Sequence, residues 1–190
     1  MQLLPLKPQA APFIFNVGSD AAEDFNVSTF NAAHGYYRQG MFLLRSAVEG
    51  LTHAASFAKR QDKAGLQAWL SGDCESPKFG NARDILLPEL GPDVTSVLSS
   101  STRSCATTLT PGLAAAMPRS DGSNGPIWVS ESFGLVYRCF RDVMAMCVVM
   151  LSVGWPKFSI PQHAEPLFDT PGTAWTPAAR AAVMARASTT

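Results

Sequence analysis

The sequence predicts an all-α protein, arranged as a four-helix bundle with a long inner loop and extended amino- and carboxyl-terminal segments. Two features support this fold class: two long stretches have apolar residues at helical spacing, and the segments between helices are rich in glycine and proline. A chain of 190 residues fits one domain with tails. We expect an amino-terminal arm at residues 1–29, a helical-bundle domain at 30–155 and a carboxyl-terminal extension at 156–190.

The clearest helix is expected over residues 37–55, after an arm that contains three prolines and no sustained period. Its apolar residues follow a 4-3-4-3-4 spacing, which keeps one helix face buried. These residues are Tyr37, Met41, Leu44, Val48, Leu51 and Ala55. A shorter helix is expected over residues 62–71, where Asp62 can cap the amino end and Gly72 stops the helix.

The middle of the chain is expected to hold an irregular connection, a third helix and the long loop. Residues 72–92 contain several glycines and prolines around the apolar stretch Ile85-Leu86-Leu87. This pattern predicts an irregular connection that contains at most a short strand. Pro92 suits the first turn of a third helix that extends to residue 104. Residues 105–129 are rich in Thr, Ala, Gly, Ser and Pro and predict the long loop.

A fourth helix is expected over residues 130–153, followed by a proline-rich tail. We expect a wide apolar face on this helix. The face consists of Phe133, Val136, Tyr137, Phe140, Met144, Cys147, Val148 and Leu151.

The composition indicates a protein whose surface is largely covered by partners. Charged residues make up 16% of the chain, against roughly 25% in a typical soluble domain. Fifteen Lys and Arg residues balance fifteen Asp and Glu residues, so any site for a polyanion has to be a local cluster. The longest apolar stretch, residues 143–151, is far shorter than the ~20 residues that span a bilayer, and we expect no membrane partner.

The sequence does not predict an enzyme or a cofactor site. It contains no GxSxG, HExxH or phosphate-binding glycine loop with Lys, and its four cysteines form no CxxC pair. His34 and His53 lie in or beside the first helix, where structural roles are the simpler interpretation.

The basic residues offer more information. Lys59, Arg60 and Lys63 gather at the start of the second helix, and Arg103 ends the third. Phosphate binding needs such side chains to converge from different elements. The alternative is that they are ordinary solvated charges.

Three segments together resemble the coat proteins of rod-shaped helical plant viruses of the tobacco mosaic virus type. The first is Pro92-Asp93-Val94-Thr95-Ser96-Val97-Leu98, followed by Thr102-Arg103. The second runs from Arg141 through alternating small and aliphatic residues to Gly154, and the third is Phe168-Asp169 followed by Trp175-Thr176. A weaker match is Gln61-Asp62-Lys63-Ala64 followed by Lys78-Phe79, and the whole resemblance covers residues 35–176.

The resemblance implies a structural coat subunit that forms a helical homopolymer around single-stranded RNA, in virions and the host cytoplasm. It implies RNA phosphate contacts at Arg103 and Lys63, then at Arg60, and last at Arg119 in the loop. Arg141, Phe168 and Trp175 would be structural, with Phe168 and Trp175 in lateral contacts toward the outside. Carboxylates facing each other between subunits would be Asp73 with Glu89 or Asp93, so that acid favours assembly.

This chain departs from the family pattern at two places. Ser100 and Ser101 stand where the family has the Asp that pairs with the Arg of the last helix, so we expect Arg141 to meet their hydroxyls or carbonyls at the end of the third helix. Further RNA-contacting arginines of the family are missing near Cys105 and near Ser130. The alternative function is an all-α interaction or adaptor module that binds no nucleic acid.

Overall fold

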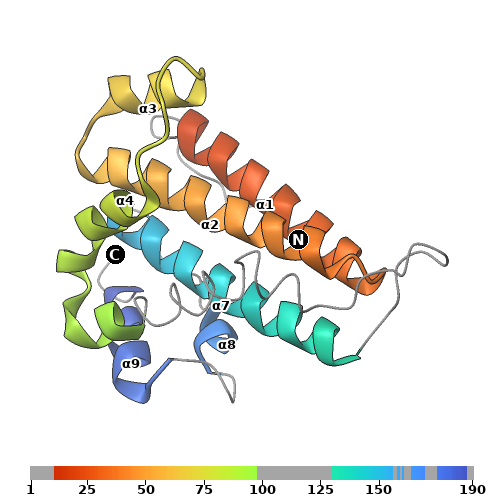
Figure 1. Ribbon diagram of the computed structural model, residues 1–190. Coiled ribbons are helices and arrows are strands. Elements are labelled where there is room, and N and C mark those ends of the chain that lie inside the picture. Colours follow the sequence, from red (N-terminus) through yellow and green to blue (C-terminus); the bar gives the residue numbers. More distant parts are fainter. Residues whose placement is uncertain are drawn as a thin grey trace.

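The computed structural model describes residues 11–97, 130–155, 158, 160, 164–169 and 175–187, without the side chains of residues 11–15, 186 and 187. Three long helices lie side by side: α1 (Ala11–Ala33), α2 (Tyr37–Lys59) and α7 (Ser130–Gly154) (Figure 1). No strand occurs in these described ranges, which confirms the all-α prediction. None of the helices within them is long and apolar enough to cross a membrane.

Helix α1 shows that the prediction of an extended arm is wrong for residues 11–29; residues 1–10 lie outside the description. Pro12 is the second residue of α1, and a proline is tolerated in the first turn because the backbone N–H there has no helical partner. From Val17 to Ala32, residues spaced by four and seven are buried against α2 and α7. Pro12 therefore lies in the first turn of the helix and does not prevent it.

The hairpin of α1 and α2 is closed by a tight turn at residues 34–36. The Tyr36 N–H donates to the Asn31 carbonyl at 2.7 Å, and Gly35 has a φ of 82°. Beyond the turn, the Ser28 hydroxyl donates to the Gly40 carbonyl at 2.9 Å. A Cβ at Gly40 would lie 3.0 Å from the Ser28 carbonyl oxygen, so glycine permits this close contact between the two helices.

Helix α2 confirms the first predicted helix, and all six residues of its predicted apolar face are buried. Helix α3 (Lys63–Leu70) confirms the second. The Asp62 carboxylate caps α3 by accepting from the Gly65 N–H at 2.8 Å. Gly72 follows the helix with a φ of 78°, a conformation that glycine adopts without strain.

The irregular connection predicted for residues 72–92 is wrong over most of its length. Helix α4 (Phe79–Leu86) is followed by a 3₁₀ turn, η1 (Leu87–Glu89). Ala82 and Leu86, four residues apart, are buried in the face of α4 that contacts α2. Pro77 and Pro88 flank α4 and do not interrupt it, so an apolar stretch between two prolines can form two helical turns.

Residues 91–97 are helical, with Pro92 in the first turn as predicted and Val94 and Val97 buried. The predicted remainder of this helix and the long loop at 105–129 lie outside the described residues. Helix α7 confirms the fourth predicted helix, but only Val136 and Cys147 of its eight predicted face residues are buried.

The buried face of α7 differs from the predicted face. Most of its residues come one position before a predicted face residue. Six of its buried residues follow a 3-4-3-4-3 spacing, at Val136, Cys139, Val143, Met146, Met150 and Val153. The neighbouring predicted positions are mostly half-buried, and Tyr137 is 54% exposed. Both the predicted and the observed faces of α7 are apolar. The apolar period therefore identified the helix but not which of its sides faces the core.

The carboxyl-terminal segment contains helices α8 (Glu165–Phe168) and α9 (Pro177–Ala187), so the extended segment predicted here is wrong for these residues. The Thr176 hydroxyl accepts from the Ala179 N–H at 3.1 Å, and Pro177 occupies the first position of α9. Ala179 and Val183 are buried, and alanine is the best helix former. The alanine-rich composition was the signal for α9.

Candidate functional site

The basic residues at the carboxyl end of α2 divide into one that is paired and two that are available. Lys59 forms an ion pair with Glu89 of η1. The Arg60 guanidinium lies 5.0 Å from the centroid of the Phe57 ring, and its charge stays exposed. Lys63, the first residue of α3, is exposed and forms no ion pair with any described residue. Arg60 and Lys63 can therefore receive a phosphate.

These two residues lie far from the amino end of α7. The first turns of α7 line a shallow hollow together with the last turns of α1, at Ser28, Thr29, Ala32, Phe133, Val136, Tyr137 and Phe140. That places the start of α7 beside the turn at residues 34–36, at the other end of α2 from Arg60 and Lys63 (Figure 1). Convergence of these two cations with the start of α7 is not observed. Arg103 and Arg119 lie outside the described residues.

Arg141 and Asp142 occupy a half-buried position on α7 next to α8. The Arg141 guanidinium donates to the Pro166 carbonyl at 3.4 Å, while the expected acceptors at Ser100 and Ser101 lie outside the described residues. Oδ1 of Asp142 is buried and has no hydrogen-bond partner among the described residues. Burial raises the pKa of the Asp142 carboxyl, and the Arg141 charge partly opposes this shift.

Phe168 and Trp175 are core residues, which fits the structural role expected of them, and their burial leaves little side-chain surface for the predicted lateral contacts. Their rings meet edge to face with centroids 4.9 Å apart, and they are 2% and 7% exposed. Arg180 of α9 forms ion pairs with Glu165 and Asp169, which holds α9 next to α8. The tail therefore folds back and buries both aromatic rings within the subunit.

The three candidate inter-subunit carboxylates are exposed, as a contact between copies would need. Glu89 is the least suitable because Lys59 already neutralises it. Asp73 and Asp93 are exposed side chains at the end of α3 and in the helical residues 91–97. A role between subunits stays a prediction for all three.

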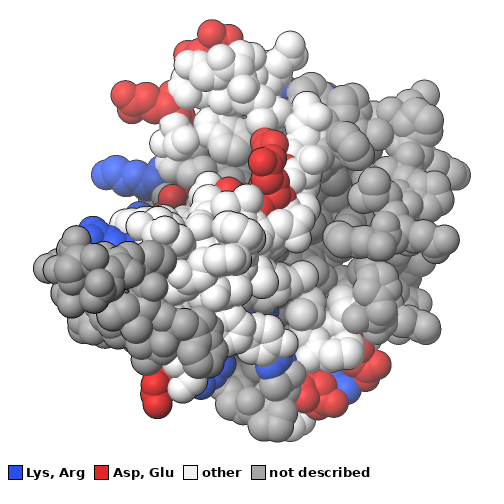
Figure 2. All heavy atoms as spheres, turned by 90° about the vertical axis from the view of Figure 1, so that its right-hand side faces the viewer, with Lys and Arg blue, Asp and Glu red and all other residues white. Residues whose placement is uncertain are grey.

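Large exposed apolar side chains are the surface feature that the sequence patterns missed. They are Val27, Phe30, Tyr36, Phe42, Leu70 and Tyr137, between 36% and 61% exposed. Figure 2, which looks onto the turn end of the α1–α2 hairpin, shows a white uncharged area on the part of this face that belongs to described residues, with acidic and basic side chains around it. The sequence could have indicated these residues as apolar side chains at helix positions that face away from the core. Such surfaces are typical of association sites.

The remaining reactive side chains are the acidic residues, the histidines and the cysteines. Within the described ranges, no group of three or more His, Cys, Asp or Glu side chains is placed to hold a metal ion. Cys139 and Cys147 are buried and Cys74 is exposed. Comparison with known proteins does not add a function: no protein-family model matches the sequence, and no curated protein or solved structure matches it either.

Proposed function

We propose that this chain is a coat protein that assembles side by side into a rod-shaped helical particle around single-stranded RNA. The observation that carries the proposal is the exposure of large apolar residues on the long helices of a charge-poor subunit. Single exposed apolar residues are normal on a monomer, but apolar side chains gathered on one surface are typical of association sites, and a polymer covers them at each contact. The segments that resemble rod-shaped virus coat proteins point to the same function.

Phosphate neutralisation supplies the affinity for RNA in this proposal. A coat that covers a whole genome needs contacts that ignore base sequence, and Lys or Arg contacts to phosphate have this property. Arg103 is the leading candidate because it matches the RNA-contacting residue in the segment that resembles the family. Lys63 and Arg60 lie at the other end of α2 from the start of α7 and form a separate candidate set.

The test compares the parent protein with Arg103→Ala, Lys63→Ala and the double variant. We expect Arg103→Ala to lower the RNA recovered per particle after nuclease treatment severalfold, and the double variant to lower it further, because each cation removed weakens phosphate binding. Arg83→Ala is the matched control, since Arg83 is bound to its neighbour Asp84. The far-ultraviolet circular dichroism of all variants should equal that of the parent.

Two results would count against this assignment. Unchanged RNA content in the double variant would remove these residues as the RNA contacts. Loss of helical signal in isolated Arg103→Ala would show that Arg103 has a structural role.

A further inference from the structure

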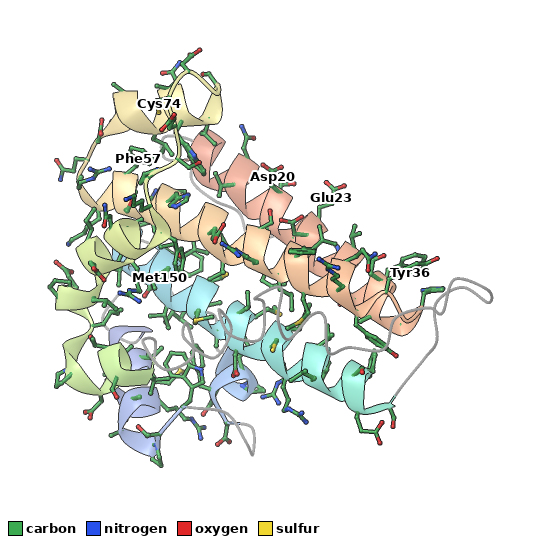
Figure 3. The ribbon with its side chains drawn as sticks, viewed as in Figure 1. Asp20, Glu23, Tyr36, Phe57, Cys74 and Met150 are labelled. Atoms are coloured by element: carbon green, nitrogen blue, oxygen red, sulfur yellow. The ribbon has the colours of Figure 1, made fainter. Side chains whose placement is uncertain are left out.

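The two helices of the hairpin expose opposite edges, and α1 provides the first. Asp20, Glu23, Val27, Phe30 and His34 follow a 3-4-3-4 spacing and are all exposed. The buried residues of α1, such as Ala21 and Ser28, lie on the other side of the helix, where Ser28 bonds to α2. Figure 3 shows Asp20 and Glu23 projecting from the side of α1 that faces away from α2. We call this stripe the α1 edge.

The second edge belongs to α2. Arg38, Phe42, Arg45 and Glu49 follow a 4-3-4 spacing on the side of α2 opposite Gly40, the residue that contacts α1. The Arg38 guanidinium lies 5.6 Å from the centroid of the Phe42 ring, and Arg45 pairs with Glu49 at 2.8 Å. Phe42 is 44% exposed. We call this stripe the α2 edge.

The two edges differ in charge. Helix α1 contains Asp20, Glu23 and Asp24 and no Lys or Arg, whereas α2 contains Arg38, Arg45 and Lys59 against Glu49 alone. Asp20 and Glu23 form no ion pair with any described residue. The acidic edge therefore lacks a cation within the described subunit, whereas the basic edge on the far side of the hairpin offers Arg38 and also Arg45, whose charge is shared with Glu49.

We propose that the α1 edge of one subunit docks on the α2 edge of the next copy. This inference rests on the proposed coat function and names the surfaces that make its lateral contact. Two different surfaces on opposite sides of a subunit give a head-to-tail contact, which repeats from copy to copy and so builds a ring or a helix. Opposite charges orient the copies, and Phe30 and Phe42 supply apolar area at the contact.

The register of the hairpin brings the matching groups to the same level. Because α1 and α2 are antiparallel and Ser28 contacts Gly40, Glu23 is level with Arg45, and Phe30 with Arg38. A copy displaced sideways without rotation would therefore place Arg45 opposite Glu23. It would also place Arg38 opposite the Phe30 ring, a favourable arrangement of a cation on an aromatic face.

A charge exchange tests this pairing in the full chain. Variant A is Asp20→Lys with Glu23→Lys, and variant B is Arg38→Glu with Arg45→Glu. Each alone brings like charges together at every contact, and we expect sedimentation velocity to show assembly only at a concentration roughly tenfold higher or more. An equimolar mixture should recover the assembly of the parent, because the α1 edge of each variant then matches the α2 edge of the other.

The matched control is Glu75→Lys with Asp84→Lys, which makes the same charge change at exposed positions outside both edges and should assemble like the parent. If variant A loses helical signal, Asp20→Asn with Glu23→Gln replaces it and should weaken assembly to a smaller extent.

Normal assembly of A and B, or no recovery in the mixture, would overturn the pairing and leave the coat function standing. Loss of RNA by B with normal assembly would make the α2 edge an RNA surface and also overturn the pairing. A parent that stays monomeric both with and without RNA would overturn both proposals.

Discussion

At the scale of single residues, His53 couples the packing of α2 to pH. Its side chain is buried against the Trp69 ring, with centroids 5.7 Å apart, and its Nε2 has no hydrogen-bond partner. Burial lowers the pKa of His53, while Glu49 and a hydrogen bond with the Pro77 backbone partly oppose the shift. The folded protein therefore holds a neutral imidazole under conditions in which the unfolded chain takes up a proton.

We expect the free energy of unfolding to fall as the pH drops below about 6.5, the ordinary histidine pKa, because the unfolded state then binds more protons than the folded state. This contribution to stability is fully present above that pH and is lost as the pH falls toward the lowered pKa of the folded state. His53→Phe should make the pH dependence shallower. Urea unfolding between pH 5 and 8 measures it, and equal slopes for parent and variant would contradict the prediction.

Some contacts of single residues could be predicted from the sequence and others could not. The buried face of α2 and the Asp62 cap could be predicted because each depends on residues a few positions apart. The burial of Phe168 and Trp175 could not, because it depends on α9 folding back onto α8, a contact between segments whose sequences do not specify each other's position.

At the scale of the elements, the contact between α2 and α7 depends on the absence of a side chain. A Cβ at Gly154 would lie 2.7 Å from Cα, 2.8 Å from Cβ and 2.9 Å from the carbonyl oxygen of Ala55. Backbone atoms cannot yield to such a group without moving the helix. Gly154 therefore sets how closely α2 and α7 approach.

Gly154→Ala should lower the free energy of unfolding by roughly 1–3 kcal/mol, the usual cost of overpacking a well-packed contact. Gly50→Ala is the matched control, because a Cβ at Gly50 of α2 meets nothing within 4 Å. This control should gain up to about 1 kcal/mol from the better helix propensity of alanine. Equal stabilities of the two variants in urea titrations would show that the close approach has no energetic role.

The elements themselves were partly predictable. Helices α2, α3 and α7 have a strong period or a clear cap, and the sequence located them. Helices α1, α4 and α9 were missed because prolines near their ends suggested extended chain. In each case the proline lies in the first turn or outside the helix, where it costs no hydrogen bond.

At the scale of the whole molecule, the zero formal net charge and the exposed aromatic residues both favour association of identical subunits in the proposed particle. A charged subunit would repeat its charge at every contact of a polymer, and this chain avoids that repulsion. On the hairpin, the α1 edge is acidic and the α2 edge carries two arginines, and in the proposed contact this difference favours association in one direction. The sequence indicated the low charge, but the two edges required the packing of α1 against α2.

The central claim, assembly around RNA, is tested most directly by negative-stain electron microscopy of the purified chain, with RNA extracted after nuclease treatment. We expect rods or stacked discs, with RNA in the rods protected from the nuclease. Discrete small particles without RNA at every pH and protein concentration would contradict it and favour an interaction or adaptor module.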